Sequence, residues 1–355
     1  MMKVLIAMSG GVDSSVAAKL LCDEGCECIG CTMKLYDNCD AGLPRGRTCC
    51  SLDDVEDARS VAFSLGMRYY VFNFKDDFRE KVIKKFASGY LRGQTSNPCI
   101  DCNRYMKFDK LLERAKLLGC DKLATGHYAR IEFDGEKYRL KKALDKSKDQ
   151  SYVLYMLTQE QLAHTLFPLG SLHKTDTRAI ADAADLSSAR KPDSQDICFV
   201  PDGDYAAAIE RLTGEKAPCG DFIDASGKIL GTHRGITHYT VGQHRGLGLS
   251  LPERRYVCGI DAESGTVTLG GSDELYSSTA EVRDFNWISG ETPSEPIRCT
   301  AKIRYRQPEQ PATAIAHKGG SITIQFDSPQ RAVTPGQAAV LYDGDTVLGG
   351  GEIVR

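Results

Sequence analysis

The chain has 355 residues, of which 41% are hydrophobic and 26% are charged, and it carries a formal net charge of −3. This composition is typical of a globular protein with two or three domains, and it excludes a protein that binds nucleic acid through a strongly basic overall charge. No segment approaches the roughly 18 apolar residues of a membrane span, and the first residues lack the pattern of a signal peptide. We therefore expect a cytoplasmic protein without a membrane contact, in which most of the 14 cysteines are buried thiols.

Predicted strands and helices alternate in the first third of the chain. Short apolar stretches predict strands, and stretches of helical periodicity that end at a glycine predict helices. The predicted strands are residues 3–8, 27–33, 68–74 and 122–127, and the predicted helices are residues 14–24, 53–65 and 107–118. This alternation is typical of an α/β domain built on a doubly wound parallel sheet.

After this domain, the predicted secondary structure of the chain changes twice. Residues 128–144 alternate around an Asp-Gly pair, which predicts a β-hairpin, and residues 149–190 are expected to be helical. Glycine and β-branched residues then become frequent, and short alternating strands recur from about residue 280. We therefore expect a small central domain and a C-terminal β-barrel after the α/β domain. The expected domain limits are residues 1–204, 205–278 and 279–355.

The sequence SGGVDSS, residues 9–15, follows the first predicted strand and opens the first predicted helix. Its two glycines let the backbone turn tightly and approach an anion, and the helix start adds unpaired N–H groups and a positive dipole end. Asp13 fits such a loop if it helps to hold Mg²⁺ beside a nucleotide. The segment lacks the Walker pattern, and it resembles the S-G-G-x-D-S loop of the pyrophosphate-loop ATPases, which adenylylate a substrate with ATP. The resemblance implies that ATP contacts Ala7, Met8, Ser9, Gly10, Gly11, Val12, Asp13 and Ser14.

Two further segments contain cysteines whose spacing is compatible with a metal site or a reactive thiol. Cys99 and Cys102 form a C-x-x-C pair in NPCIDCNRYMKF, and Cys198 lies in KPDSQDICFV. A C-x-x-C pair alone is compatible with a metal knuckle, a redox pair or one reactive thiol beside an ordinary one. Arg104 and Lys107 follow the pair and are cations of the kind that lower the pKa of a thiol. Since zinc usually takes four close ligands, we interpret other clustered cysteines as buried or loop thiols: Cys28, Cys31, Cys39, Cys49 and Cys50.

Eight motifs occur in the same order as in the tRNA-specific 2-thiouridylases, called MnmA in bacteria and TrmU in mitochondria. They are SGGVDS, NPCxxCN, ATGHYAR, KDQSY, SQDICFV, VGQHRGLG, KIRYRQ and PGQAAVLYDGDxVLGGG. These motifs extend over nearly the whole chain, which therefore resembles this family from end to end. The resemblance implies an N-terminal domain like the adenine nucleotide alpha hydrolases, a small central domain and a C-terminal β-barrel.

The resemblance also implies a reaction, the ATP-dependent 2-thiolation of the wobble uridine in tRNA. In the family, AMP is transferred to the uracil C2 oxygen, and sulfur carried as a cysteine persulfide then replaces that oxygen. The residue that matches Cys198 is assigned the persulfide, and the residue that matches Cys102 is assigned the nucleophile that frees the sulfur. The two are proposed to become joined by a disulfide, which a reductant opens. A cysteine desulfurase or a sulfur-relay protein is the implied donor.

Further contacts are implied outside the loop and the two cysteines. Met33 and Gly126 are expected to flank the adenine. The target base in the anticodon loop is expected to be bordered by Asn97, Pro98 and Cys99. The remaining implied tRNA contacts are His127, Lys148, Asp149, Gln150, Arg304, Tyr305 and Gln337.

The chain departs from the family pattern at Cys99, where many members have an aspartate with a proposed role in proton transfer. Asp101 lies nearby at a different helical phase, so the group that transfers this proton is open. A second interpretation is that Cys99, Cys102 and Cys198 hold a [4Fe–4S] cluster, as three cysteines do in related thiolation enzymes.

Two other functions also fit a nucleotide-binding loop. One is a pyrophosphate-loop ligase that acts on a small molecule and has no use for Cys198. The other is a non-catalytic RNA-binding or sulfur-relay protein, which would bind nucleotide without forming AMP. The formation of AMP and its dependence on tRNA would separate the three functions.

Overall fold

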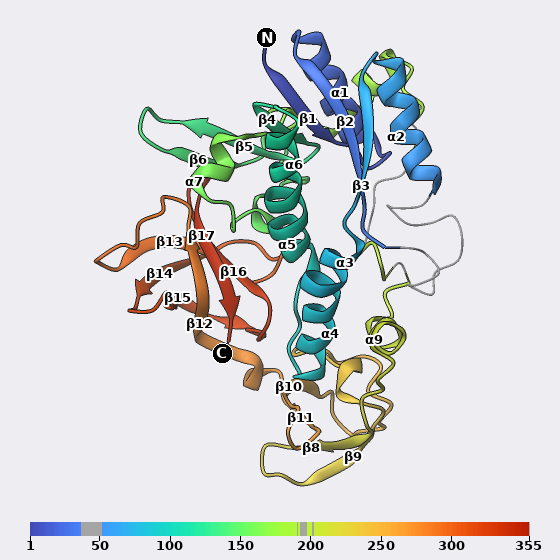
Figure 1. Ribbon diagram of the computed structural model, residues 1–355. Helices are drawn as coiled ribbons and strands as arrows, with labels where there is room; N and C mark the ends of the chain where they lie inside the picture. Colours follow the sequence, from blue (N-terminus) through green and yellow to red (C-terminus); the bar gives the residue numbers. More distant parts are fainter. Residues whose placement is uncertain (37–51, 190, 192–196, 201, 355) are drawn as a thin grey trace.

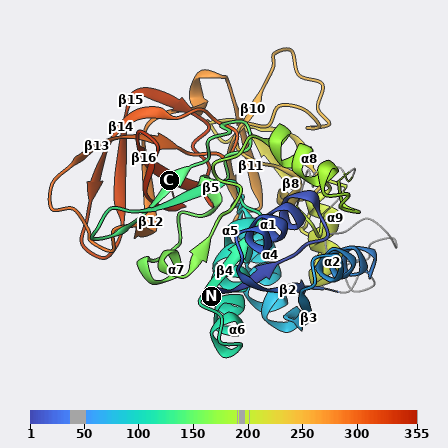
Figure 2. The same ribbon diagram turned by 90° about the horizontal axis from the view of Figure 1, so that it is seen from above.

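The computed structural model describes residues 1–36, 52–189, 191, 197–200 and 202–354 (Figure 1). An N-terminal α/β part, a small central part and a C-terminal barrel are arranged around a column of helices (Figure 1). Seen from above, the barrel lies beside the α/β part (Figure 2). No helix in the described part of the chain is both long and apolar enough to cross a membrane.

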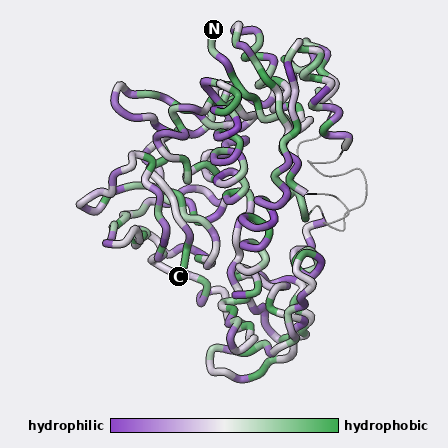
Figure 3. Tube along the Cα trace, in the orientation of Figure 1, coloured by the Kyte–Doolittle hydropathy of each residue, from purple (hydrophilic) through white to green (hydrophobic). Residues whose placement is uncertain are grey.

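The N-terminal part is built on a five-stranded parallel sheet with the strand order β3-β2-β1-β4-β7. Val4 and Ile6 of β1 face one side and Leu5 faces the other, and all three are fully buried. An apolar run of this kind suits a parallel strand that is covered on both faces, and it appears as a green stretch in Figure 3. The strands are β1 (Lys3–Ala7), β2 (Glu27–Lys34), β3 (Arg68–Asn73), β4 (Lys122–Thr125) and β7 (Thr165–Leu166).

Helices cover both faces of this sheet. One face packs against α1 (Val12–Asp23), α2 (Leu52–Ser64) and α8 (Lys174–Ala183). The other face packs against a run of helices, of which the sequence predicts only the part at residues 107–118. These are α3 (Lys75–Phe78), η1 (Arg79–Ile83), α4 (Lys84–Leu91), α5 (Pro98–Asp101), the π-helix η2 (Cys102–Leu111) and α6 (Leu112–Leu117).

The expectation that residues 149–190 are helical is wrong for most of this segment. It contains the short η3 (Ser151–Val153), α7 (Gln159–Ala163), β7 and α8. Its apolar run Tyr152–Leu157 is buried, and its carbonyl groups bond to the barrel instead of to a helix. The Asn286 side chain donates hydrogen bonds to the carbonyl oxygens of Tyr155 and Leu157, at 2.7 and 3.1 Å. Tertiary packing therefore decides the backbone here.

The central part contains a mixed four-stranded sheet with the order β10-β11-β8-β9, preceded by α9 (Tyr205–Thr213). It packs against the end of α4, where Leu91 contacts its apolar core. The strands are β8 (Gly220–Ile223), β9 (Ile229–His233), β10 (Tyr256–Asp261) and β11 (Thr266–Gly270), and η4 (Ile236–His238) follows β9.

The C-terminal barrel closes through the pairing of β12 with β17. The hairpin of β5 (Ala129–Phe133) and β6 (Tyr138–Lys142), which was predicted within the N-terminal domain, extends the barrel sheet because β6 pairs with β17. The expected domain limits stay a prediction. The barrel strands are β12 (Tyr276–Trp287, after η5, Asp273–Leu275), β13 (Ile297–Lys302), β14 (Gln310–Ala316), β15 (Ile322–Arg331), β16 (Ala338–Asp343) and β17 (Thr346–Ile353).

Gly350 in β17 lets the barrel approach the buried segment that contains Tyr155. A Cβ atom at this position would lie 2.6 Å from the Tyr155 ring and 2.9 Å from the Ala339 carbonyl oxygen. We expect Gly350→Ala to lower the free energy of unfolding by about 1–3 kcal/mol, as overpacking does, measured by urea denaturation. Gly259→Ala is the matched control in β10, since its Cβ would meet nothing closer than the Thr268 side chain at 3.9 Å. Equal losses in both variants would contradict this explanation.

Candidate active site

A cavity of about 360 Å³ lies at the carboxyl ends of β1, β2 and β4, which is a volume suited to a small-molecule site. Four segments contribute most of its lining. They are the ends of these strands, the start of α1, the helix pair α5–η2, and the segment around Cys198. Of the predicted site residues, the cavity is lined by Ala7, Met8, Ser9, Asp13, Ser14, Met33, Pro98, Cys99, Cys102, Gly126, His127, Gln150 and Cys198.

The predicted phosphate loop closes on itself through its serines. The Ser9 N–H donates a hydrogen bond to Ser14 Oγ at 3.2 Å, and Ser14 Oγ donates to the Gly11 carbonyl oxygen at 3.0 Å. Gly10 has a φ of +72°, and a Cβ there would lie 2.4 Å from the Asp54 carbonyl oxygen. Gly10, Gly11 and Val12 therefore shape the loop without lining the cavity.

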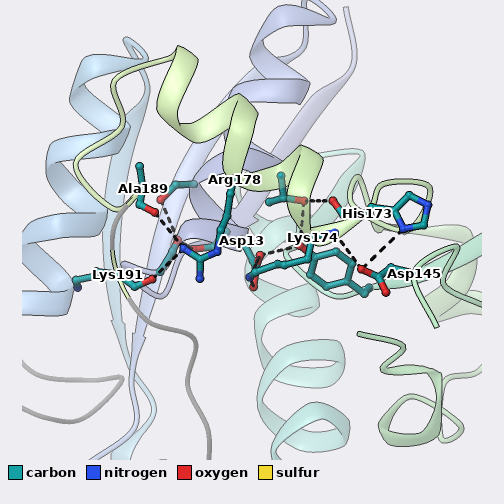
Figure 4. A network of polar contacts seen from close by, with 12 residues as sticks. Asp13, Asp145, His173, Lys174, Arg178, Ala189 and Lys191 are labelled. Carbon is teal, nitrogen blue, oxygen red and sulfur yellow. Dashed lines mark hydrogen bonds and ion pairs between the residues drawn. The ribbon is translucent and has the colours of Figure 1, made fainter. Parts of the chain in front are cut away.

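Asp13 is engaged by a lysine that the sequence analysis did not identify (Figure 4). Lys174 Nζ lies 2.6 and 2.8 Å from the two carboxylate oxygens, and the Tyr128 hydroxyl donates to one of them at 2.9 Å. The Lys174 side chain is only 11% exposed. Both Asp13 oxygens thus contact an ammonium group, and the expected role of Asp13 as a Mg²⁺ ligand stays a prediction.

Gly126 brings the end of β4 against the phosphate loop. A Cβ atom at this position would lie 2.8 Å from the Ser14 backbone nitrogen and 2.9 Å from the Asp13 carbonyl carbon. Only a glycine allows this approach without displacing backbone. Met33, at the end of β2, lines the same cavity, so both residues expected beside the adenine lie next to the loop.

Cys99 and Cys102 are positioned by the start of the helix pair α5–η2. The Asn97 side chain caps α5 by accepting a hydrogen bond from the Cys99 N–H at 3.1 Å, and Pro98 occupies the first helical position. Asn97 itself lines a separate small hollow. The structure thus directs both thiols of the C-x-x-C pair to the cavity that the phosphate loop also lines.

Cys198 reaches the same cavity from a segment anchored by aromatic residues. The Tyr36 hydroxyl donates a hydrogen bond to the Cys198 carbonyl oxygen at 2.8 Å. Phe199 is 2% exposed, and its ring meets those of Phe78 and Phe86 edge-on at 5.8 and 5.4 Å. The remainder of the SQDICFV motif, residues 194–196, lies outside the described residues.

The cysteines do not form a metal site in the described part of the chain. No group of three or more His, Cys, Asp or Glu residues there is arranged to hold a metal ion. Cys99, Cys102 and Cys198 share the cavity, but as arranged they do not form the cluster site of the second interpretation. Cys28 and Cys31 are buried thiols, and burial raises the pKa of Cys31. The other clustered cysteines, Cys39, Cys49 and Cys50, lie outside the described residues.

Asp101 does not line the cavity and so does not stand in for the aspartate that the family has at Cys99. It is 5% exposed and lies 2.8 Å from Lys85 Nζ. Burial raises the pKa of the Asp101 carboxyl group, although Lys85 opposes this effect. Arg104 lines the same separate hollow as Asp101, whereas Lys107 lines the cavity.

His127 is enclosed although it lines the cavity. It is 7% exposed, and its ring lies 5.9 and 5.8 Å from the rings of Phe108 and Phe167. Its Nδ1 atom lies 2.7 Å from Thr125 Oγ1, and its Nε2 atom lies 3.2 Å from Lys107 Nζ. Burial, and then the charge of Lys107, hold the pKa of His127 well below the usual 6.5, so the imidazole is neutral at neutral pH.

Two of the residues expected to contact tRNA, Tyr305 and Gln337, form hydrogen bonds to segments that are distant in sequence. The Tyr305 hydroxyl donates to the Asp149 carbonyl oxygen at 3.4 Å, next to Lys148 and Gln150 in sequence. The Gln337 side chain donates to the carbonyl oxygen of Thr95 at 2.7 Å, just before Asn97.

The Arg304 guanidinium group forms hydrogen bonds within the protein. Its Nη2 atom donates to the carbonyl oxygens of Val241 and Ala332, at 3.1 and 2.9 Å, and to Thr334 Oγ1 at 2.6 Å. In this arrangement Arg304 joins the central part to the barrel, and its contact with RNA stays a prediction.

Comparisons with known proteins cover nearly the whole chain. Residues 2–202 match the family described as tRNA methyl transferase HUP domain, residues 208–271 match its PRC-barrel domain, and residues 277–353 match the aminomethyltransferase beta-barrel domain. The tRNA-specific 2-thiouridylase MnmA of Acetivibrio thermocellus is 52% identical over 355 residues, which is 99% of each chain. The chain belongs to the tRNA-specific 2-thiouridylase family.

Other members of the 2-thiouridylase family are nearly as similar. MnmA 2 of Caldanaerobacter subterraneus is 51% identical and MnmA of Clostridioides difficile is 48% identical, each over 99% of this chain and 98% of the relative. The recognition made from the eight motifs is therefore confirmed. The expected succession of a parallel-sheet domain, a small central domain and a C-terminal barrel is confirmed as well.

The lowered pKa of His127 predicts a pH dependence of stability. Below pH 6.5 the unfolded chain binds a proton at this position and the folded chain does not, so the contribution of His127 to stability falls as the pH decreases. We expect the difference in unfolding free energy between the wild type and His127→Gln to decrease between about pH 7.5 and about pH 5.5, by at most about 1.4 kcal/mol per pH unit. Urea denaturation at both pH values measures it, and a constant difference would contradict the buried, neutral imidazole.

Proposed function

We propose that this chain is an ATP-dependent tRNA-uridine 2-sulfurtransferase that thiolates the wobble uridine. The observation that carries the proposal is that Cys102 and Cys198 line the same cavity as the loop Ser9–Ser14. A nucleotide loop and two separate thiols in one cavity suit a reaction in which AMP activates an oxygen and sulfur then replaces it. A small-molecule ligase would use the loop and leave the thiols without a role.

In the first step, the uracil C2 oxygen attacks the α-phosphorus of ATP. A bond forms between this oxygen and phosphorus, and the bond to pyrophosphate breaks. Ser9, Ser14 and the N–H groups at the start of α1 would hold the phosphates. Mg²⁺ stays a prediction that accompanies ATP, and Asp13, which contacts Lys174 in this structure, would be its ligand from the loop.

In the second step, sulfur reaches C2 from a persulfide on Cys198. The Cys102 thiolate attacks the Sγ atom of Cys198, the bond to the terminal sulfur breaks, and hydrosulfide leaves. Hydrosulfide adds to C2, loses its proton, and AMP departs with the former C2 oxygen. The two cysteines are left as a disulfide, and a reductant supplies two electrons to open it. A cysteine desulfurase or a sulfur-relay protein would supply the persulfide sulfur.

The wobble uridine suits such a cavity because it lies in a single-stranded loop. Turning an unpaired base outward costs on the order of a few kcal/mol or less. Pro98, Cys99 and Gln150 line the cavity and could border the base. The exposed Tyr305 offers a ring for stacking beside Asp149.

Substitution of either cysteine should separate the two steps. We expect Cys102→Ser and Cys198→Ser each to abolish 2-thiouridine formation while adenylylated tRNA and pyrophosphate are still formed, because serine removes the sulfur chemistry and leaves the loop intact. Mass spectrometry of tRNA nucleosides and pyrophosphate release measure the two steps. Cys219→Ser is the control, since this exposed thiol lies in the central part. Thiolation by Cys198→Ser with a persulfide donor would show that Cys198 does not carry the sulfur.

The dependence of adenylylation on RNA tests the choice of substrate. We expect AMP formation from ATP to require tRNA, because the uracil oxygen is the group that accepts AMP. AMP formation is measured with and without tRNA that has an unmodified wobble uridine, and with the same tRNA carrying 2-thiouridine as a control. Equal AMP formation without tRNA would favour a ligase that acts on a small molecule.

A further inference from the structure

Among the residues that the structure describes, the cavity is lined by three thiols of interest and by the predicted phosphate loop, but by few positive charges. Among the described residues that line it, Lys107 is the only lysine or arginine. Asp13, which also lines the cavity, is paired with Lys174. Lys107 therefore has no carboxylate partner among the described lining residues, and it shares the cavity with Cys99, Cys102 and Cys198.

The π-helix η2 places Lys107, and not Arg104, in the lining of the cavity that Cys102 also lines. Hydrogen bonds in a π-helix connect residues i and i+5, so residues five apart, such as Cys102 and Lys107, lie nearly one turn apart on one face. Both line the cavity. Arg104 lies on another face of η2 and lines the hollow next to Asp101 instead.

His127 fixes Lys107 without neutralising it. A neutral imidazole has one donor and one acceptor nitrogen. Since Lys107 Nζ is a donor, Nε2 of His127 accepts the hydrogen bond at 3.2 Å, and Nδ1–H is left to donate to Thr125 Oγ1 at 2.7 Å. The imidazole also packs against the rings of Phe108 and Phe167. The ammonium group therefore has a fixed position beside a partner that carries no negative charge.

We propose that Lys107, held by His127, stabilises the thiolate of Cys102 and so determines the pH at which this cysteine reacts. The S–H bond breaks, its proton goes to solvent and the electron pair stays on Sγ, so no oxidant or reductant is needed. The inference rests on the proposed function only for what the thiolate attacks, because the ionisation itself requires neither ATP nor tRNA.

Among the described residues, the other titratable groups that line the cavity with Cys102 do not supply a positive charge. Cys31 is a buried thiol whose pKa is raised by burial, and His127 is neutral. Asp13, Cys99 and Cys198 are acids and would disfavour a thiolate when they ionise. Behind the helix, Lys85 and Arg104 lie at the hollow that contains Asp101, with Asp284 and Glu352.

The test measures the alkylation of Cys102 by iodoacetamide as a function of pH, in a Cys99→Ser, Cys198→Ser background without ATP or tRNA. Lys107→Met should move the alkylation midpoint to higher pH by about 1–3 units, as expected for the loss of an adjacent opposite charge. Lys107→Arg should restore most of the wild-type profile. Lys110→Met is the matched control on the same helix, since Lys110 pairs with Asp77 at 3.3 Å and does not line the cavity.

Two variants of His127 test its positioning role. His127→Phe removes the acceptor and should shift the Cys102 profile part of the way toward that of Lys107→Met. His127→Gln keeps an acceptor oxygen and should shift it less. Urea denaturation of each variant confirms folding, and Lys107→Gln replaces Lys107→Met if the latter does not fold.

The outcome is independent of whether the chain thiolates tRNA. A shifted alkylation profile supports the inference even if no 2-thiouridine is formed, in which case the proposed function alone fails. An unchanged profile in Lys107→Met would overturn the inference. If the profile is unchanged and pyrophosphate release without a sulfur donor falls in Lys107→Met with the wild-type cysteines, Lys107 acts on the nucleotide instead of on Cys102.

Discussion

The parallel pairing of β1 with β2 and β4 determines where the reactive residues of this protein meet. Parallel strands end at the same edge of a sheet, so the phosphate loop after β1, Met33 on β2 and Gly126 after β4 converge there. The helices on one face of the sheet then bring Cys102 to this edge, and the anchored segment at Phe199 brings Cys198. Without this alignment, the chain would contain the same residues but no common cavity.

Several elements could be predicted from sequence because their signals are local. The apolar run 3–8, the glycines after it and the helix that follows are fixed by burial and turn geometry over a few residues. The hairpin 129–142 was also visible from its alternation. Its attachment to the barrel was not, because β6 joins β17 through residues about 200 positions apart in sequence. The run 152–157 was misjudged for a similar reason, since the barrel decides its conformation.

The candidate site was predictable as a set of residues but not as a geometry. Cys102 and Cys198 were linked only through resemblance to a family, and nothing in their own sequence contexts predicts that they share a cavity. The contact between Asp13 and Lys174 joins residues 161 positions apart, so no pattern in either segment identifies it. The π-helix η2 was predicted in part as an ordinary helix, and a change from i+4 to i+5 hydrogen bonding leaves no clear trace in composition. That change decides which side chains face the thiols.

One short connection has a mechanical consequence. Gly126, His127 and Tyr128 are the only residues between β4 of the parallel sheet and β5 of the barrel sheet. The Tyr128 hydroxyl reaches Asp13, and its backbone bonds to Gln150 through both its N–H and its carbonyl oxygen. A macromolecule that moved the barrel relative to the parallel sheet would therefore act on Tyr128 and, through its hydrogen bond, on Asp13 in the phosphate loop. If its affinity changes with the occupancy of that loop, thermodynamic reciprocity requires the nucleotide to change the affinity for the macromolecule by the same factor.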